Sequence, residues 1–537
     1  MKVLSQSKLI FLISIFLVFF GNITFFKKTL EVYPLEGVNI LFIGSIVITF
    51  ILFINILFTL VSSKYTTKVL LIVIVLISAF TSYFMDTYNV VIDDNMIANS
   101  LQTNLDESLD LLSLQLVFYA FFLGIVPAYF IYNTPVTYGS LKSELFSKIK
   151  SIVASLIIIA ILLLSFSSYY TSFFREHKTL RYHANPTFWI YSVKKYIKKT
   201  FTSDTVVVKP IGNDAKITED KEEKKELIIM VVGEAARADR FSLNGYERET
   251  NPLLKQEDII NFSNMRSCGT ATAVSVPCMF SIFGRDDYSY KKGIGTQNVL
   301  DILKKSGVEI LWRDNNSDSK GVALRVPYED FRKPNMNTIC IDGECRDIGM
   351  LVGLDEYIEK NKDKDILIVL HQMGNHGPAY YKRYPKEFEK FKPVCKTNQL
   401  EQCSKEELGN AYDNAILYTD YFLSRVIDFL KPYDNTHETA MIYMSDHGES
   451  LGENSLYLHG IPYFMAPETQ THVGAIMWFG EEMKEEIDIK KLKSHKDKEY
   501  SQDYLFHTLL NIFEVDTKVY DKNLNILENS VKIEENK

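Results

Sequence analysis

The sequence predicts a membrane-anchored α/β protein, in which five transmembrane helices precede a domain built on a largely parallel sheet. Nearly all long apolar runs of the 537-residue chain lie before about residue 170. Nearly all histidines and all six cysteines lie after that point. From Leu227 onward, short apolar runs alternate with helical patterns. These three observations indicate a membrane anchor joined to a soluble domain.

Five apolar runs approach the ~20 residues that a helix needs to cross the hydrocarbon core of a bilayer. They cover Leu9 to Phe26, Val38 to Val61, Val69 to Phe84, Leu112 to Ile131 and Ile149 to Ser165. A signal peptide is the alternative for the first run. Because no small-residue cleavage site follows it, we expect this run to be retained as a span.

Loop charges set the orientation of the five spans. Lysines lie before the first run, between the second and third, and between the fourth and fifth. The loop between the third and fourth runs is instead rich in Asp and Glu. The amino terminus is therefore expected in the cytoplasm, and residues 1–170 are expected to cross a bacterial inner membrane and deliver the chain to the periplasm.

Residues 171–226 are expected to form an interfacial helix and a linker. Basic and aromatic residues mix around Trp189, which is typical of a helix lying in the headgroup layer. An ordinary amphipathic linker helix is the alternative. The polar run from Asp214 to Glu226 indicates a solvated linker into the domain formed by residues 227–537.

The soluble domain contains five apolar runs of strand length, which read LIIMVVG, VEILWR, ILIVLHQ, AMIYMS and VGAIMWF. Helical patterns such as Val299–Ser306 and Gly409–Leu430 lie between them. This alternation predicts a mostly parallel sheet that is covered by helices on both faces.

The cysteines form three closely spaced pairs, Cys268/Cys278, Cys340/Cys345 and Cys395/Cys403. Short-range disulfides in an oxidising compartment are the simplest interpretation. Reduced thiols or a zinc site are the alternatives, although no CxxC spacing occurs. The net charge of −8 is spread without blocks, and the absence of a basic stripe gives no reason to expect nucleic acid as a partner.

Ligand-type residues follow several of the predicted strands, where functional groups gather in open α/β sheets. They are Glu234, His371, His376, Asp446 and His447, with His459 twelve residues after His447. Carboxylates and imidazoles at such positions are the ligands of Zn²⁺ or a similar divalent ion. Structural hydrogen-bonded pairs are the alternative for each residue taken alone.

A candidate nucleophile lies in the run CGTATAVSVPC, which holds the hydroxyls of Thr270, Thr272 and Ser275. A stapled structural loop is the alternative. A divalent metal lowers the pKa of a bound hydroxyl enough to make it a nucleophile. The residues from Ala273 to Phe283 are predicted to form a helix, whose N-terminus near Thr272 would favour anionic oxygen.

Several longer motifs resemble those of a known family. They read GEAARADRFSLNGYERETNP, NMRSCGTATAVSVPCMFS, LWRDNNSDSKGV, HQMGNHGPAY, YMSDHGESLGEN and YLHGIPY. These motifs are similar to those of the bacterial phosphoethanolamine transferases that modify lipid A, a family that includes the mobile colistin-resistance enzymes. The resemblance implies an alkaline-phosphatase-like α/β/α domain in the periplasm, attached to a five-span anchor.

The resemblance also implies a reaction and its cofactor. Phosphatidylethanolamine would donate phosphoethanolamine to Thr272, and lipid A or another lipooligosaccharide or periplasmic acceptor would then receive it. One zinc ion would be firmly bound, with a second possible. The implied zinc-binding residues are Glu234, Thr272, Asp446 and His447.

Further roles follow from the same resemblance. His376 and His459 would contact the phosphoryl group, hold a second zinc or transfer protons. The implied substrate contacts are Thr270, Asn316, Ser317 and Lys320, together with Asn99, Thr103 and Glu107 in the acidic outer loop. Ser275 is expected to pack within the helix, and the enzyme is expected to be a monomer. Ala235 and Ala271 depart from the commonest form of the motifs without affecting the implied ligands.

Three other functions remain open at this point. A related membrane-anchored phosphoglycerol transferase or phosphodiesterase would share the anchor and the threonine. A sulfatase would need a cysteine or serine modification motif, which is not found around Thr272. A non-enzymatic membrane scaffold would not need the ligand set. We expect the transferase, with a lowered negative surface charge and polymyxin resistance as consequences of its reaction.

Overall fold

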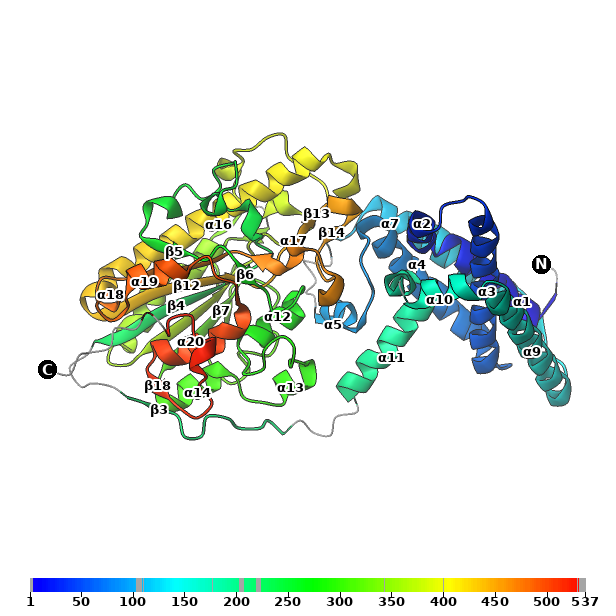
Figure 1. The fold of residues 1–537 in the computed structure, drawn as a ribbon, viewed down its shortest axis with the longest axis horizontal. Helices are drawn as coiled ribbons and strands as arrows, with labels where there is room; N and C mark the ends of the chain where they lie inside the picture. Colours follow the sequence, from blue (N-terminus) through cyan, green and yellow to red (C-terminus); the bar gives the residue numbers. More distant parts are fainter. Residues whose placement is uncertain are drawn as a thin grey trace. The chain divides into compact units, whose positions relative to one another are not determined.

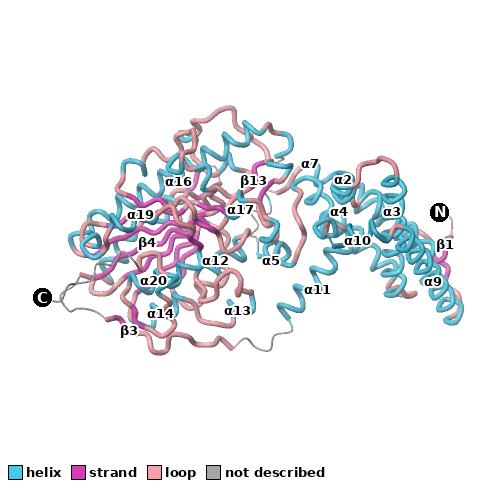
Figure 2. Tube along the Cα trace, viewed as in Figure 1, coloured by secondary structure: helices cyan, strands magenta, loops and turns pink. Residues whose placement is uncertain are grey.

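The computed structural model describes residues 3–102, 109, 111–175, 177–201, 207–218, 224–341, 343–398, 400–528 and 530. The chain divides into two compact units (Figures 1 and 2). One comprises Met1–Ile97 with Leu112–Tyr196, and the other comprises Ala98–Leu111 with Ile197–Lys537. We call them the membrane unit and the catalytic unit.

The membrane unit is built from long apolar helices. They are α1 (Gln6–Phe20), α2 (Ile23–Val32), α3 (Val38–Val61), α4 (Thr67–Tyr88), α7 (Leu114–Tyr119), the π-helical turn η1 (Ala120–Ile125), α8 (Val126–Asn133) and α9 (Leu141–Ser165). Among the described residues, four helical stretches are long and apolar enough to span a bilayer, and a fifth is obtained if α1 and α2 count as one bent span. Short strands β1 (Leu4–Ser5) and β2 (Val136–Thr137) pair in parallel.

The first predicted span differs from the expected single helix. Helices α1 and α2 meet at an angle of 60° around Gly21 and Asn22. The Asn22 side chain donates to the Leu17 carbonyl at 2.9 Å and accepts from the Asn185 backbone N–H at 2.9 Å. A helix break inside a membrane protein requires such partners, because the freed backbone groups have no water to bind.

The segment after α9 begins within the packing of the membrane unit. It contains α10 (Ser167–Arg175), the 3-10 turn η2 (Lys178–His183) and α11 (Thr187–Phe201). Phe173 and Leu180 are buried in the same apolar cluster as residues of α1 and α3. The ordered membrane unit therefore reaches beyond residue 170. Helix α5 (Asp94–Gln102) lies in the acidic loop between α4 and α7.

The catalytic unit is organised around a seven-stranded sheet. Its spatial order is β5 (Ile259–Asn261), β16 (Ala475–Phe479), β12 (His437–Ser445), β4 (Lys225–Gly233), β11 (Ile366–His371), β7 (Glu309–Asp314) and β8 (Tyr328–Asp330). Only β16 runs antiparallel to its neighbours in this sheet, as the described pairings show. All five predicted strands are present, and the prediction of a mostly parallel sheet is confirmed. The two short edge strands were not predicted.

Helices cover both faces of this sheet (Figure 1). Helix α16 (Lys405–Leu430) lies on one side, and α14 (Val299–Ser306) and α20 (Leu505–Ile512) lie on the other. Along β4, Ile228, Met230 and Val232 pack in one core with α14 and α20, while the alternate residues are equally buried. A strand that is buried on both faces reads as a continuous apolar run. The predicted α/β/α architecture is confirmed.

The remaining elements surround this frame. Short helices are α12 (Thr272–Met279), α13 (Tyr290–Ile294), α15 (Leu354–Lys360), α17 (Glu468–Thr471), α18 (Met483–Glu486) and α19 (Ile489–His495). Small pairings join β3 (Lys216–Ile217) to β18 (Val515–Asp516), β6 (Met265–Arg266) to β15 (His472–Val473) and β17 (Tyr500–Ser501), β9 (Cys340–Ile341) to β10 (Glu344–Cys345), and β13 (Ser450–Leu451) to β14 (Tyr457–Leu458). Strand β3 falls within the segment that was expected to be a solvated linker.

Candidate metal and nucleophile site

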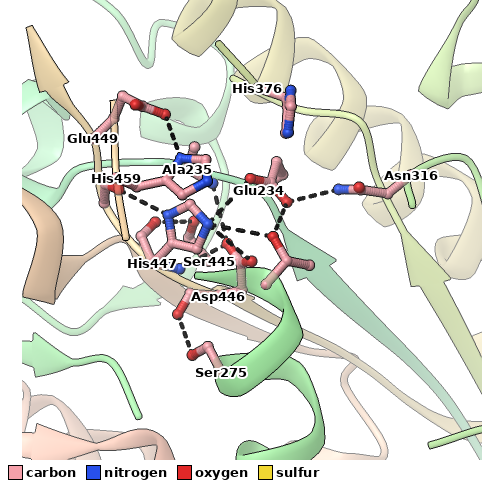
Figure 3. A network of polar contacts seen from close by, with 12 residues as sticks. Glu234, Ala235, Ser275, Asn316, His376, Ser445, Asp446, His447, Glu449 and His459 are labelled. Carbon is pink, nitrogen blue, oxygen red and sulfur yellow. Dashed lines mark hydrogen bonds and ion pairs between the residues drawn. The ribbon is translucent and has the colours of Figure 1, made fainter. Parts of the chain in front are cut away.

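Four of the predicted site residues meet at the carboxyl edge of the sheet. Glu234 follows β4, Asp446 and His447 follow β12, and Thr272 is the first residue of α12. Strands β4 and β12 are parallel neighbours, so their ends deliver these side chains to one place. Glu234, Asp446 and His447 are fully buried, and Thr272 is 3% exposed. Figure 3 shows the labelled acids and His447 converging above the helix that carries Ser275.

The distances within this group are short. Thr272 Oγ1 lies 3.1 Å from Glu234 Oε2 and 3.3 Å from His447 Nε2. His447 Nε2 is also 3.3 Å from Glu234 Oε1 and 3.4 Å from Asp446 Oδ2. Candidate ligand atoms of the two acids and the histidine all lie within 4.8 Å of one another. The candidate nucleophile, Thr272, is thus beside a potential metal position.

The chemistry of the group fits a divalent cation. Two buried carboxylates side by side repel each other and are costly to bury without a compensating positive charge. Asp446 Oδ2 accepts no hydrogen bond from the part of the chain that the structure describes. Two carboxylates, an imidazole and a hydroxyl provide the oxygen and nitrogen ligands that Zn²⁺ takes in a tetrahedral site.

His447 is held in the tautomer that a metal ligand needs. Its Nδ1 lies 2.8 Å from the Gly448 carbonyl oxygen. Only a protonated nitrogen can face a carbonyl at this distance, so Nδ1 carries a proton and Nε2 is the ring nitrogen left to bind a metal. Gly448 itself is required here, because a Cβ at this position would lie 2.2 Å from the Thr469 carbonyl oxygen.

The two carboxylates are held by hydrogen bonds on their other sides. Asp446 Oδ1 accepts from the backbone N–H groups of Ala235 at 3.1 Å and His447 at 2.7 Å. Asn316 Nδ2 donates to Glu234 Oε2 at 2.7 Å. Ala235, whose N–H donates to Asp446, adopts a positive φ of 54°. Asn316, implied as a substrate contact, therefore contacts an acid of the metal position.

The predicted histidines His459 and His376 also lie near this group. The His459 ring is 4.2 Å from the His447 ring and 6.0 Å from the His376 ring, measured between centroids. His459 Nδ1 lies 3.3 Å from Glu449 Oε2. Burial, followed by the positive charge of Arg383, lowers the pKa of His376 well below its ordinary value. His376 is therefore neutral at pH 7.

His371 does not join the site, although it also ends a strand. Its Nδ1 lies 2.9 Å from Asp314 Oδ2, and both side chains are fully buried. Asp314 also accepts from the backbone N–H groups of Asn316 and Asp318, at 3.0 and 3.1 Å. The pair therefore shapes the loop that carries Asn316. Burial raises the pKa of Asp314, but the contacts with His371 and Trp312 and the charge of Arg332 together outweigh it and leave the pKa lowered.

The other implied substrate contacts are distributed as follows. The Thr270 hydroxyl donates to the Ile461 carbonyl at 2.7 Å, which ties the nucleophile loop to the segment after His459. Lys320 Nζ donates to the Ser317 carbonyl at 2.6 Å. Asn99 lies in α5, whereas Thr103 and Glu107 lie outside the described residues.

The structure forms the three expected disulfides, Cys268–Cys278, Cys340–Cys345 and Cys395–Cys403. The first encloses the beginning of α12 and so includes Thr272. Asp503 lies near Cys268 and Cys278, but this group holds no metal because the two sulfur atoms are bonded to each other.

Three residues of the site were missed in the sequence, or given a lesser role. Gln502 contacts the backbone of Asp446, and Ser275 does so from α12. Asp347 accepts from the backbone N–H groups of Met373 and Gly374, just before His376. These side chains bind main-chain atoms. Such contacts leave no pattern in a sequence, because every residue has the same main chain. The only signal was the position of Ser275, three residues after Thr272.

Family models match both halves of the chain. A model described as phosphoethanolamine transferase EptA/EptB matches residues 50–201. A sulfatase model matches residues 226–515, which cover the sheet and the site.

Curated relatives and a solved structure match almost the whole chain. Phosphatidylethanolamine transferase Mcr-2 of Escherichia coli is 44% identical over 525 residues, which are 95% of this chain and 96% of the relative. Phosphoethanolamine transferase EptA of Escherichia coli K12 is 40% identical over 523 residues, 96% of this chain and 95% of the relative. The structure of the integral membrane lipooligosaccharide phosphoethanolamine transferase A of Neisseria meningitidis is similar with a TM-score of 0.95 and 35% identity. It covers 99% of this chain and 100% of that chain.

Proposed function

This chain belongs to the phosphoethanolamine transferase family, and from that premise we propose that it moves phosphoethanolamine from phosphatidylethanolamine to lipid A or a related acceptor through an ester on Thr272. The chain is a multi-pass enzyme of the bacterial inner membrane, with its catalytic unit in the periplasm. The observation that carries the proposal is the Thr272 hydroxyl, buried within 3.3 Å of both Glu234 and His447.

Zinc is the ion that we propose for this site. Glu234, Asp446, His447 and Thr272 would hold it, since their donor atoms suit Zn²⁺ and two buried acids call for a cation. When bound, the ion lowers the pKa of the threonine hydroxyl and balances charge on the phosphoryl oxygens. His376 and His459 are proposed to contact the phosphoryl group or to hold a second ion.

In the first half-reaction, Thr272 Oγ1 forms a bond to the donor phosphorus, and the bond between phosphorus and the diacylglycerol oxygen breaks. The Thr272 O–H bond breaks at the same time, and its proton would pass to Glu234 Oε2, which lies 3.1 Å from Oγ1. The leaving oxygen takes up one proton and departs as diacylglycerol. His459 would supply that proton from Nε2 as an imidazolium, whose Nδ1 side faces Glu449 Oε2 at 3.3 Å.

In the second half-reaction, an acceptor oxygen attacks the same phosphorus, and the bond between phosphorus and Thr272 Oγ1 breaks. Oγ1 would then take its proton back from Glu234. His376 is the proposed proton acceptor for a hydroxyl because of its place beside His459, with the two ring centroids 6.0 Å apart. The product carries an ammonium group beside a phosphate, so its net negative charge is reduced. We propose that the enzyme acts as a monomer, because one chain contains every group named here.

A phosphoglycerol transferase or a phosphodiesterase of the same superfamily is the second candidate, since the sulfatase model covers the catalytic unit. The purified full-length protein in vesicles with lipid A separates these functions. We expect diacylglycerol and modified lipid A from phosphatidylethanolamine. Consumption of phosphatidylglycerol instead, or release of free phosphoethanolamine without acceptor modification, would contradict the proposal.

A further inference from the structure

We propose that Gln502 and Ser275 are positioning residues, which together fix Thr272 relative to the acid and histidine at the end of β12. We call them the brace. Neither side chain contacts the Thr272 hydroxyl or the potential metal position in the described contacts. Their role rests on the proposed function, because it concerns the attack of Thr272 on the donor phosphorus.

Three hydrogen bonds to main-chain groups hold the Gln502 side-chain amide. Nε2 donates to the backbone carbonyls of Ser445 at 2.6 Å and Asp446 at 3.0 Å. Oε1 accepts from the Cys268 backbone N–H at 2.7 Å and lies 2.8 Å from Ser275 Oγ. This pattern sets the amide orientation, since the NH₂ group cannot face the Cys268 N–H. Gln502 is fully buried, so an unmade bond would be costly.

Ser275 contributes the second half of the brace from the helix of the nucleophile. It lies three residues after Thr272 in α12, and residues at this spacing share one side of a helix. Its Oγ is 2.5 Å from the Asp446 carbonyl oxygen and accepts from the Gly269 backbone N–H at 3.3 Å. Ser275 is also fully buried. The helix of Thr272 is thus bonded directly to the backbone of Asp446.

The brace joins three segments that are distant in the sequence. One is the nucleophile loop with α12, the second is the end of β12, and the third is the segment from β17 into α20 that carries Gln502. Strand β17 also pairs with β6, just before the nucleophile loop. The main chain of Asp446 is held by the brace, while its Oδ2 faces His447 and the potential metal position.

This arrangement matters for rate because attack requires near-contact of the reacting atoms. A displacement of ~1 Å in the nucleophile can lower a rate on the order of 100-fold. Loosening the brace would displace Thr272 relative to Asp446 and His447, although every proposed ligand side chain would still be present. The expected signature is a slower attack by Thr272 with substrate binding and metal content retained.

Two variants test this inference in the full-length protein. Gln502→Glu keeps the shape and loses the donor to the Ser445 and Asp446 carbonyls, while Ser275→Ala removes one hydroxyl. Asn414→Asp is the matched control, because Asn414 is an equally buried amide. It joins α16 to Lys390 and Phe391 through bonds of 2.8 to 3.0 Å, and it contacts no site residue in the described contacts.

The measurements are the single-turnover rate of Thr272 ester formation from phosphatidylethanolamine vesicles, the KM for that lipid, bound zinc and the unfolding temperature. We expect both brace variants to form the ester roughly 10- to 100-fold more slowly. Their KM and zinc content should match the wild-type protein. Asn414→Asp should lower the unfolding temperature and leave the rate unchanged.

A wild-type rate of ester formation in the two brace variants would overturn the inference. It would also be overturned if the rate fell only by the same fraction as the bound zinc. If Gln502→Glu does not fold, Ser275→Ala decides the question by the same criteria. Absence of any Thr272 ester in the wild-type protein would instead contradict the proposed function. The two failures are therefore distinguishable.

Discussion

At the residue scale, the site depends on which atom of each side chain is left for a metal. His447 presents Nε2 because its Nδ1 faces the Gly448 carbonyl. Asp446 presents Oδ2 because its Oδ1 accepts two backbone N–H groups. These contacts around the ligands orient them before any ion binds, as the outer partners of metal ligands do in general.

Removing one of these ligands should remove the metal. Asp446→Asn and His447→Ala should each lower the zinc bound by the purified protein. Each substitution leaves only three of the four proposed ligands, so the affinity for zinc should fall. Elemental analysis after dialysis measures the loss. Asp420→Asn is the control, since Asp420 is a buried acid of α16 that accepts from the Leu253 and Leu254 backbone. Unchanged zinc in the ligand variants would exclude them as ligands.

The sequence indicated which residues could be metal ligands, but it did not indicate which side chains contact them. Glu234, Asp446 and His447 could be found because each follows an apolar run that ends at the carboxyl edge of the sheet. The same reasoning also selected His371, which pairs instead with Asp314 away from the group. Strand ends predict position along the sheet, but the contacts of a neighbouring loop decide which side chain faces the site.

At the element scale, α12 is the short helix that carries the proposed nucleophile, Thr272. Thr272 stands at its first position, where N–H groups are unpaired and favour negative charge on oxygen. It begins one residue before the predicted helix and ends at Met279, four residues before the predicted end. A turn that continues to Phe283 follows the helix, and the disulfide from Cys268 to Cys278 encloses its start.

Loss of this disulfide should affect activity as well as stability. The Cys268→Ala, Cys278→Ala double variant should lose about 2–3 kcal/mol of unfolding free energy, from the entropy of an opened loop. Its transfer rate should also fall at temperatures where it is folded. The matched double variant at Cys395 and Cys403, with a similar sequence separation of 8, should lose comparable stability and keep its rate. Equal rates in both variants would contradict the link to the nucleophile.

Helix α16 contributes a pH-dependent term to stability through Asp420. Burial raises the pKa of Asp420 to about 7, although the Leu253 and Leu254 N–H groups lower it in part. The folded protein holds a proton that the unfolded chain, with a pKa of ~3.9, releases. This contribution is therefore complete below the unfolded pKa and is lost as the pH rises through about 7.

The unfolding temperature of Asp420→Asn, compared with the wild-type protein at each pH, isolates this effect. The wild-type advantage should shrink as the pH rises from about 4 to about 7. A difference that stays constant across that window would show that Asp420 has no raised pKa.

The accuracy of the predicted elements follows from their burial. Strands β4, β11 and β12 were predictable because both faces are buried, which produces unbroken apolar runs. The edge strand β8 reads Tyr-Glu-Asp and is only partly buried, so no apolar run marks it. The bend between α1 and α2 was hidden for the opposite reason, since both sides of the break are apolar.

At the scale of the whole molecule, a membrane unit and a periplasmic catalytic unit in one chain keep the enzyme at the surface where its lipid substrates reside. The proposed reaction would add an ammonium group to an anionic lipid. Cationic peptides are attracted by the negative surface potential of the membrane. This potential depends on the charge of the lipids and decays over about one Debye length from the surface.

Cells that express the enzyme should therefore tolerate more polymyxin than cells without it, and their lipid A should gain phosphoethanolamine. Cells with the Thr272→Ala variant should match the empty strain in both measurements. Mass spectrometry of lipid A and a killing assay on the same cultures check this. Tolerance without modified lipid A would separate resistance from the proposed reaction.

The central claim is that Thr272 carries the phosphoethanolamine between donor and acceptor. Intact-mass analysis of the full-length protein mixed with phosphatidylethanolamine, in the absence of acceptor, tests it most directly. The account predicts one phosphoethanolamine adduct, mapped by peptide analysis to Thr272, which disappears when lipid A is added. An adduct that persists in the Thr272→Ala variant, or modified lipid A formed by that variant, would contradict it.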